Sequence, residues 1–287
     1  MNKKLNIKNT DLHTHSIYSD GVLLPKEVVK EAKKKGIENF SLTDHNSLGG
    51  IEEAINAGKI LGVKVIPGIE IRAKEDEVLG YFIDYQNPAF KKEVKKLQDV
   101  YTKIVKFVIK EINKSGIKIS YRDILKEYYP NTNLMEIHVI RYLNKIGYGE
   151  VRDLWKKHMV DIWKSPIYSE EISVADAIKL IIKHGGVPVL AHPWVEPSSK
   201  ELLSDKNFEE LVKGGLQGIE IDNGDRDERR DDGTLKKINF LAEKYNLVIT
   251  SGSDFHGDKK SMELKIHQIG EHNCEDGVIE KLKLRKK

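Results

Sequence analysis

The chain has 287 residues, of which 39% are hydrophobic and 32% are charged, and its formal net charge is +3. No apolar run approaches the roughly 18–20 residues that a membrane-spanning helix needs, and the N-terminus lacks the apolar segment of a secretory signal. Cys274 is the single cysteine, which excludes an intramolecular disulfide and is typical of a reducing cytoplasm. We therefore expect a soluble, cytoplasmic protein with no membrane partner.

Short β-rich runs alternate with helical segments up to about residue 90. Pro25 suits the first turn of a helix and Gly36 suits the position just past its end, which predicts a helix over residues 25–35. A second helix is expected over residues 48–61, with Gly62 after it. The predicted strands around these helices are residues 39–45, 63–66, 70–72 and 78–83.

Residues 91–164 show no good strand pair, and their pattern is helical. Apolar residues recur every three or four positions, as in an amphipathic helix, at Val94, Leu97, Tyr101, Ile104, Val108 and Ile112. Further helices are predicted over 121–129, 134–146 and 150–158. The stretch carries 17 Lys and Arg against 9 Asp and Glu, which makes its charge +8 and that of the remaining chain −5. We predict a basic helical insertion, either a lid that attracts an anionic substrate or an ordinary lysine-rich surface.

After this stretch the alternation returns. Helices are expected over 174–184, 200–213 and 234–245, and strands over 187–191, 218–221 and 247–251. Strands that alternate with helices of about 10–15 residues are typical of a parallel sheet or barrel. The sequence therefore predicts one α/β domain formed by residues 1–90 and 165–287, interrupted by the insertion at 91–164.

Histidines and carboxylates gather where predicted strands stop. The five clusters are Asp11-Leu-His13-Thr-His15 with Asp20, Thr43-Asp44-His45, Glu70 after Pro67-Gly68-Ile69, Ala191-His192-Pro193, and Ser253-Asp254-Phe255-His256. In parallel α/β folds the active site forms at the carboxyl ends of the strands, from the loops that follow them. We therefore expect the five clusters to converge on one site.

The residue types in these clusters are those of a metal site. A lone histidine is more often a surface residue, but His13 and His15 on an extended segment direct both imidazoles to the same side. Imidazoles together with carboxylates suit Zn²⁺, Mn²⁺ or Fe²⁺, and a carboxylate can bridge two ions. Asp11 is a candidate for fixing the tautomer of a liganding histidine from outside the metal shell.

The clusters also carry a resemblance. DLHTHSIYSDG, LTDHNSLGG, PGIEI, LAHPW and GSDFHG resemble, in order and spacing, the motifs of the PHP (polymerase and histidinol phosphatase) metallophosphoesterases. The resemblance implies a distorted seven-stranded β/α (TIM-like) barrel with two or three divalent ions. One PHP branch has a helical insertion where residues 91–164 lie. That branch comprises stand-alone phosphatases of nucleoside monophosphates or bisphosphates and 5′-to-3′ exoribonucleases.

The resemblance also implies which residues bind metal. They are His13, His15, Asp20, His45, Glu70, His192, Asp254 and His256, with Glu70 as the bridging carboxylate. His138 matches an insertion histidine that contributes to a third ion, although a helix-surface role is the alternative.

Three positions depart from the branch. Glu77 stands where a histidine is usual and is an additional candidate ligand, which leaves the number of ions open between two and three. Glu136 stands where an arginine is frequent, and Trp194 and Val195 follow where Gly and Arg are common. These departures indicate a different substrate preference.

The remaining polar residues of interest have weaker roles. We expect structural or surface roles for His158, His184, His267 and His272. Asp222 and Asn223 end a strand on the metal side, where they either contact substrate or cap a turn. No covalent nucleophile is indicated.

The function that we predict is metal-dependent hydrolysis of nucleotide phosphoesters or short RNA by a metal-activated water. The catalytic candidates are His192, His256 and Asp254, and either histidine would protonate the leaving group if it were not bound to metal. A histidinol-phosphate phosphatase is the alternative enzyme, although it usually lacks the insertion. A metal-bound nucleic-acid-binding PHP module is the non-enzymatic alternative. No obligate protein partner is indicated.

Overall fold

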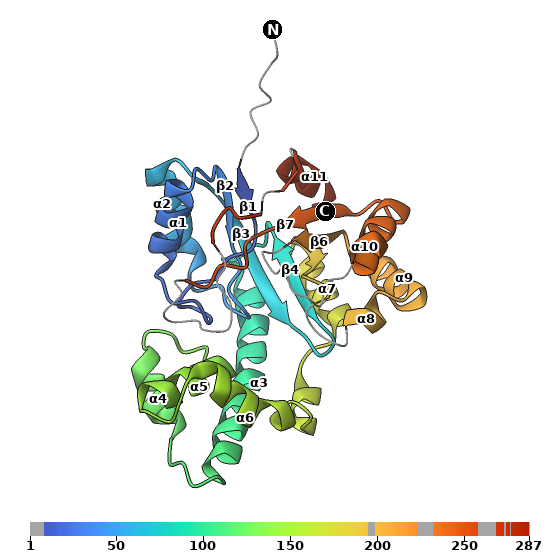
Figure 1. Cartoon of the computed structure of the whole chain (residues 1–287). Helices are drawn as coiled ribbons and strands as arrows, with labels where there is room; N and C mark the ends of the chain where they lie inside the picture. The colour runs from blue at the N-terminus through green and yellow to red at the C-terminus, as the bar shows by residue number, and fades with distance from the viewer. Residues whose placement is uncertain are drawn as a thin grey trace.

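The computed structural model describes residues 9–194, 199–222, 232–257, 268–272, 274–275 and 277–286. Its centre is a seven-stranded sheet in which each strand pairs with its neighbours in the chain (Figure 1). The strands are β1 (Thr10–Asp11), β2 (Asn39–Leu42), β3 (Lys64–Arg72), β4 (Glu77–Tyr81), β5 (Val187–Leu190), β6 (Gly218–Asp222) and β7 (Val248–Ser251).

The sheet is mixed rather than fully parallel. β1, β2 and β3 are parallel, and so are β5, β6 and β7, but β4 runs antiparallel to both β3 and β5. Only four residues, Ala73–Asp76, separate β3 from β4. A parallel pair needs a crossover of about a dozen residues or more, so this connection permits only an antiparallel pair.

The two ends of the sheet meet just beyond β1 and β7. Thr14 bridges to Phe255, and the backbone N–H of Asp254 donates to the carbonyl of His13. Gly252 is required here, because a Cβ at this position would lie 2.3 Å from the Cβ of His13. The strands therefore form a nearly closed, distorted β/α barrel, as predicted.

β3 is longer than expected, because the two predicted runs are one strand that continues through Pro67 and Gly68. A Cβ at Gly68 would lie 2.3 Å from the Ser41 hydroxyl, so only glycine permits this approach to β2. The unbroken strand carries Glu70 and Arg72 to the end of the barrel where β1 and β2 also stop.

Helices cover the outside of the barrel and close one of its ends. The outer helices are α1 (Pro25–Lys34), α2 (Ile51–Leu61), α7 (Val174–Lys183), α8 (Ser199–Leu202), α9 (Asp205–Lys213) and α10 (Asp232–Lys244). The helix predicted over 200–213 is thus two helices. α11 (Val278–Arg285), which the sequence pattern did not reveal, places Leu282 among the barrel-interior residues Leu12 and Tyr81.

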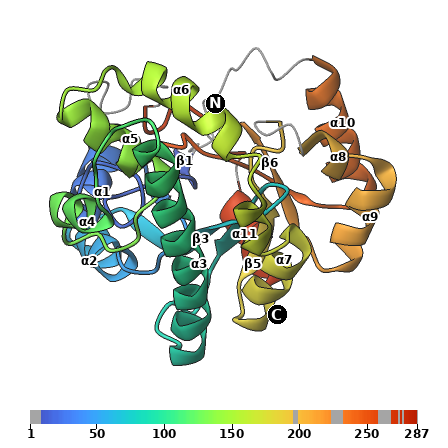
Figure 2. The ribbon, with the colours of Figure 1, turned by 90° about the horizontal axis from the view of Figure 1, so that it is seen from below.

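At the opposite end of the barrel from α11 lies a group of helices from residues 88–170 (Figures 1 and 2). They are α3 (Pro88–Asn113), α4 (Tyr121–Tyr128), α5 (Glu136–Lys145), α6 (Val151–Ile162) and the 3₁₀ helix η1 (Pro166–Glu170). Asn87 caps α3 by accepting from the N–H groups of Ala89 and Phe90. The helices pack on each other through a hydrophobic cluster of their own, which includes Ile104 and Ile140.

No helix in the described part of the chain is both long and apolar enough to cross a membrane.

Candidate metal centre

The predicted ligands come together at the barrel end that faces the helical group. His13 and His15 follow β1, His45 follows β2, and Glu70 lies near the end of β3. On the other side of the barrel, His192 follows β5, and Asp254 and His256 follow β7. Asp20, Glu77, Asp254 and His256 are partly exposed, whereas the other ligands are buried, so these four residues mark the solvent-facing side.

Glu70 occupies the middle of the cluster and is completely buried. Its Oε2 lies 3.1 Å from His13 Nε2, 3.2 Å from His15 Nε2 and 3.1 Å from His45 Nδ1. Its Oε1 lies 3.2 Å from His192 Nε2. A carboxylate in contact with four imidazoles has the placement that a metal-bridging ligand requires.

Two further carboxylates face the histidines from the solvent side. Asp254 Oδ1 lies 3.1 Å from His15 Nε2 and 3.4 Å from His13 Nε2. Asp20 Oδ1 lies 3.3 Å from His256 Nε2 and 3.9 Å from His45 Nε2.

Within the described residues, ligand atoms that lie within 4.8 Å of one another form four groups. The groups are His15–Asp20–His45–His256, His13–His15–Asp254, His13–Glu70–His192 and His45–Glu70–Glu77. Because they share members, they form one continuous set of nitrogen and oxygen donors.

The donors fit a cation better than they fit one another. Both Glu70 oxygens, Asp20 Oδ1, and the Nε2 atoms of His13 and His15 are buried without a hydrogen-bond partner. Leaving a buried polar atom unsatisfied costs about 1–3 kcal/mol, and more for a charged group. Coordination to a divalent ion would satisfy all of these atoms at once, and the mixed donors suit Zn²⁺, Mn²⁺ or Fe²⁺.

The charges in the cluster favour bound cations. Burial alone would lower the pKa of His15, but Asp254 and Glu70 outweigh it and raise that pKa to about 10. His13 behaves alike, since Glu70, Glu220 and Asp254 raise its pKa well above the usual value against the effect of burial. Carboxylates that attract protons this strongly also attract divalent ions, so metal binding would displace protons.

Comparisons with known proteins agree with the motifs and with this geometry. The family profile described as PHP domain matches residues 11–186, which is more than half of the chain. The chain belongs to the PHP domain family.

The PHP chain is similar to several curated enzymes over most of their lengths. It is 27% identical to a 3′,5′-nucleoside bisphosphate phosphatase of Chromobacterium violaceum, covering 86% of this chain and 87% of the relative. It is 28% identical to a phosphoribosyl 1,2-cyclic phosphate 1,2-diphosphodiesterase of Eggerthella lenta, covering 86% and 94%. A 5′-3′ exoribonuclease of Haemophilus influenzae is 27% identical, with 87% and 90% covered. All three names denote hydrolysis of phosphoesters, and this PHP chain is a metal-dependent phosphoesterase of the same class.

A solved structure supports the barrel. A Bifidobacterium adolescentis protein described as a metal-dependent phosphoesterase superposes with a TM-score of 0.82, at 23% identity, covering 97% of this chain and 96% of the other.

Glu220 is a site residue of this PHP barrel that sequence reasoning missed. It is fully buried on β6, and its oxygens lie 3.1 and 3.2 Å from His13 Nδ1. The backbone N–H of His192 donates to the same carboxylate. Glu220 therefore holds His13 with Nε2 directed at Glu70, as outer partners of liganding histidines do. The sequence did contain a signal for this residue, since Glu220 is an acidic residue within the otherwise apolar run Gly218–Ile221.

Asp11, the candidate for fixing a histidine tautomer, contacts the main chain. Its carboxylate accepts hydrogen bonds from the backbone N–H groups of His13, Ser253 and Gly270. Among the described residues, no imidazole ring hydrogen-bonds to Asp11. It joins the loop after β1 to the loop after β7. Asp44 acts similarly, since it accepts from the Ser16 N–H and from the hydroxyls of Ser16 and Ser19.

Glu77 and His138, the two residues on which a third ion depends, differ in placement. Glu77 faces the cluster, with Oε1 3.5 Å from His45 Nδ1 and Oε2 3.4 Å from His192 Nε2. His138 lies outside the four donor groups. Both of its ring nitrogens face other partners, since Nδ1 accepts from the Met135 N–H and Nε2 lies 3.4 Å from Asn131 Nδ2. Burial and the nearby Arg141 lower the pKa of His138 to about 4, so it is neutral.

Four side chains of the helical group bind main-chain carbonyls in the ligand-bearing loops. Asn131 donates to Ser19 at 2.7 Å, Arg141 to Asp20 at 2.7 Å, Asn133 to His45 at 2.7 Å, and Gln98 to Asn46 at 2.9 Å. We call these four residues, Gln98, Asn131, Asn133 and Arg141, the carbonyl clamp. They attach the helices directly to the loops of Asp20 and His45.

The other predicted positions lie away from the donors or outside the described residues. His184 is buried, contacts Glu93 at 3.0 Å and stacks on Phe90, which is a structural role. His158 is partly exposed on α6, and His272 and Trp194 are buried. Asp222 ends β6. His267, Asn223 and Val195 lie outside the described residues.

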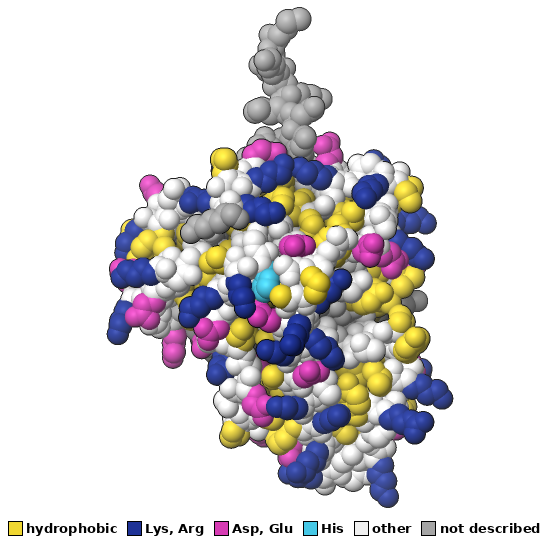
Figure 3. All heavy atoms as spheres, turned by 180° about the vertical axis from the view of Figure 1, so that it is seen from behind, with side chains coloured by type: hydrophobic (Ala, Val, Ile, Leu, Met, Phe, Trp, Pro, Cys, Tyr) yellow, Lys and Arg dark blue, Asp and Glu magenta, His cyan; other side chains and the backbone are white. Residues whose placement is uncertain are grey.

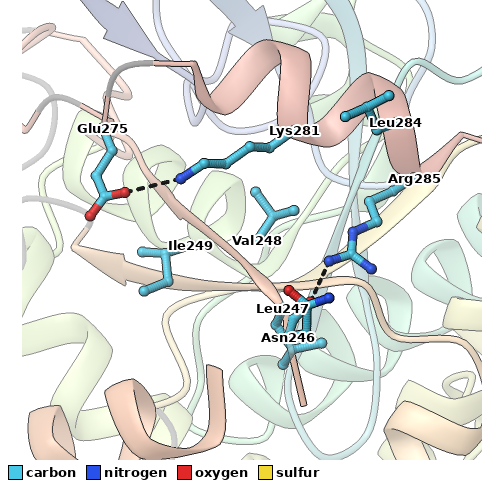
Figure 4. Close-up of a pocket in the computed structure, with 8 residues that line it drawn as sticks. All are labelled: Asn246, Leu247, Val248, Ile249, Glu275, Lys281, Leu284 and Arg285. Atoms are coloured by element: carbon cyan, nitrogen blue, oxygen red, sulfur yellow. Dashed lines mark hydrogen bonds and ion pairs between the residues drawn. The ribbon is translucent and has the colours of Figure 1, made fainter. Parts of the chain in front are cut away.

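A hollow at the far end of the barrel contains no comparable chemistry. It has a volume of about 490 Å³ and lies beside α11 (Figure 4). Its cations are paired, since Lys281 contacts Glu275 and Arg285 donates to the Asn246 carbonyl.

Proposed function

We propose that this PHP enzyme hydrolyses phosphate esters of nucleotides, either nucleoside monophosphates, 3′,5′-bisphosphates or short RNA. The observation that carries the proposal is the buried donor set around Glu70, with its unsatisfied oxygens and imidazole nitrogens. The names of the Chromobacterium and Haemophilus relatives supply the substrate class.

We propose that the donors hold two or three Mn²⁺, Zn²⁺ or Fe²⁺ ions. The ligands would be His13, His15, Asp20, His45, Glu70, His192, Asp254 and His256, with Glu77 as an addition and His138 as the residue with least geometric support. Divalent ions at such a site lower the pKa of water towards about 7 and offset the charge of the phosphate.

The chain's own residues would orient the donors and handle the protons. Glu220 keeps the proton of His13 on Nδ1, so that Nε2 is free towards Glu70. His256 Nδ1 lies 2.7 Å from the carbonyl of Asp254, which keeps its proton there and leaves Nε2 as a ligand atom facing Asp20. Whichever of His192 and His256 is not bound to metal would protonate the leaving group.

We also propose that residues 91–164 form an insertion subdomain that covers the site, on the barrel formed by 1–90 and 165–287. The carbonyl clamp supports a fixed cover rather than a hinged one. Basic side chains spread over the helical part in Figure 3, which is consistent with attraction of an anionic substrate. A cytoplasmic location, expected from the single cysteine, stays a prediction.

A substrate panel with Mn²⁺-loaded protein tests the function. It would include nucleoside monophosphates, 3′,5′-bisphosphates, short 5′-phosphorylated RNA and histidinol phosphate, each with and without a chelator. We expect the highest kcat/KM on a nucleotide or RNA and loss of turnover on chelation. Fastest turnover of histidinol phosphate would favour the alternative enzyme, and no turnover of any phosphoester by metal-loaded protein would contradict the proposal.

A further inference from the structure

Arg72 connects the candidate metal centre to the helical insertion. It is the last residue of β3 and pairs directly with Glu77 of β4 across the antiparallel ladder. Its Nε lies 3.3 Å from Glu77 Oε1, and its Nη1 lies 3.4 Å from Glu136 Oε2 on α5. One guanidinium is therefore shared between a carboxylate of the barrel and a carboxylate of the insertion.

The insertion holds Glu136 firmly in this position. Glu136 is only 1% exposed, and the Tyr168 hydroxyl donates to its Oε1 at 3.1 Å. The Tyr101 ring lies 5.2 Å from the Arg72 guanidinium carbon, and the Tyr101 hydroxyl donates to Glu171. These contacts form a partly buried pocket in which a positive charge at Arg72 is favoured.

Glu77 lies between Arg72 on one side and the donors of the proposed metal centre on the other. Its carboxylate oxygens lie 3.5 Å from His45 Nδ1 and 3.4 Å from His192 Nε2, and it belongs to the donor group that also contains His45 and Glu70. A guanidinium and a divalent ion bound to the same carboxylate repel each other, so a closer pairing with Arg72 weakens metal binding by Glu77.

We propose that Glu136 is a positioning residue that draws Arg72 away from Glu77 and thereby sets the metal affinity of the His45–Glu70–Glu77 group. The inference rests on the metal centre proposed above. It explains how this chain uses a glutamate at position 77: the insertion supplies the second carboxylate that Arg72 needs, and Glu77 remains available to the ion.

Equilibrium binding of Mn²⁺, measured by dialysis and elemental analysis, tests the proposal without reference to activity. In Glu136→Gln the acid is replaced by an amide of the same size, Arg72 pairs more closely with Glu77, and we expect the weakest Mn²⁺ site to bind roughly tenfold less tightly. In the double variant Arg72→Met/Glu136→Gln the competing cation is gone, and we expect affinity at or above the wild-type value.

Relative to Glu136→Gln, the added Arg72→Met substitution should raise the Mn²⁺ affinity again, and this recovery separates a positioning role of Glu136 from structural support alone. If Glu136 only stabilised the fold, the double variant would bind Mn²⁺ no better than the single variant. That result, or unchanged affinity in Glu136→Gln, would overturn the inference. Thermal unfolding would verify that each variant is folded. If Arg72→Met/Glu136→Gln is unstable, Arg72→Lys/Glu136→Gln takes its place; because this variant keeps the positive charge, its Mn²⁺ affinity should stay as low as that of Glu136→Gln.

Matched substitutions on the exposed N-terminal part of α6 give the controls. Glu150→Gln and Arg152→Met make the same chemical changes at exposed positions and should leave Mn²⁺ binding unchanged. Failure of wild-type protein to bind Mn²⁺ would refute the proposed function itself, whereas normal wild-type binding and turnover with an unaltered Glu136→Gln isotherm would refute only this inference.

Discussion

The barrel and the helical insertion serve the same site by different kinds of contact. The barrel supplies the side-chain donors, because the predicted ligands of the five clusters, apart from Asp20 in the loop before α1, lie at or just beyond strand ends. The insertion supplies side-chain N–H groups that bind the main-chain carbonyls of Ser19, Asp20, His45 and Asn46. The difference teaches that the barrel carries the donor groups around Glu70, whereas the placement of two donor-bearing loops, those of Asp20 and His45, is shared with the helical group.

The largest expected effect comes from removing a barrel donor. His13→Ala deletes a buried imidazole that contacts both Glu70 and Asp254. We expect kcat/KM to fall by more than the roughly 100-fold that loss of an outer partner of a ligand produces, with lower Mn²⁺ content and a retained fold. Steady-state kinetics and elemental analysis measure both quantities.

The matched control for that variant is His158→Ala, the same substitution on the partly exposed α6 surface. It should change neither turnover nor metal content. Unchanged turnover in His13→Ala would contradict the assignment of the donors to the barrel.

Removing a barrel residue that only orients a predicted metal-binding histidine should have a smaller effect on activity. Glu220→Gln keeps the size of the side chain but removes the charge that faces His13 Nδ1. We expect a 10- to 100-fold loss of metal affinity or activity, because the tautomer and orientation of His13 are less well fixed. Glu243→Gln on the exposed side of α10 is the control, and equal behaviour of the two variants would show that Glu220 is not coupled to the site.

A single contact of the insertion should give a still smaller effect. Asn133→Ala leaves the buried His45 carbonyl without its donor, which we expect to lower the free energy of unfolding by about 1–3 kcal/mol and to weaken metal binding several-fold. Denaturant unfolding and Mn²⁺ titration measure the two effects.

Asn144→Ala provides the comparison within the insertion. Asn144 also donates to a backbone carbonyl, that of Gly149, but at an exposed position away from the ligand loops. We expect a smaller loss of stability and no change in Mn²⁺ affinity. If both asparagine variants altered metal binding equally, the carbonyl clamp would have no specific role in placing His45.

The donors could be predicted from the sequence because strand ends are local features. His13, His15 and His45 lie beside runs whose β character is visible, and the rule that such ends meet at one face brings them together without further information. The helix ends at Gly36 and Gly62 were equally local, since both residues adopt the left-handed conformation that favours glycine.

Contacts between distant elements could not be predicted in this way. Asn133 lies in a loop and Gln98 on a helix, where polar residues are ordinary, and nothing nearby in sequence indicates that His45 and Asn46 are their partners. The antiparallel direction of β4 depended on how short the turn after Arg72 is. Glu220, for which no expectation came from the sequence, contacts the His13 ring, whereas Asp11 accepts from the His13 backbone N–H, because only the closed barrel determines which carboxylate reaches the ring.

The smallest expected effect tests whether the surface charge of the insertion reaches the barrel site. Lys156→Gln/Lys157→Gln removes two exposed charges from α6 without touching the carbonyl clamp. If the +8 charge of residues 91–164 draws in anionic substrate, kcat/KM should fall about two- to threefold at low ionic strength with kcat unchanged. At about 1 M salt the screening length is only about 3 Å, so the difference from wild type should disappear.

The same change at Lys283 and Lys286, beside the opposite end of the barrel, should have no effect. A loss that persists at high salt, or none at low salt, would mean that these lysines are an ordinary solvated surface, and that the insertion acts on the site only through its direct contacts.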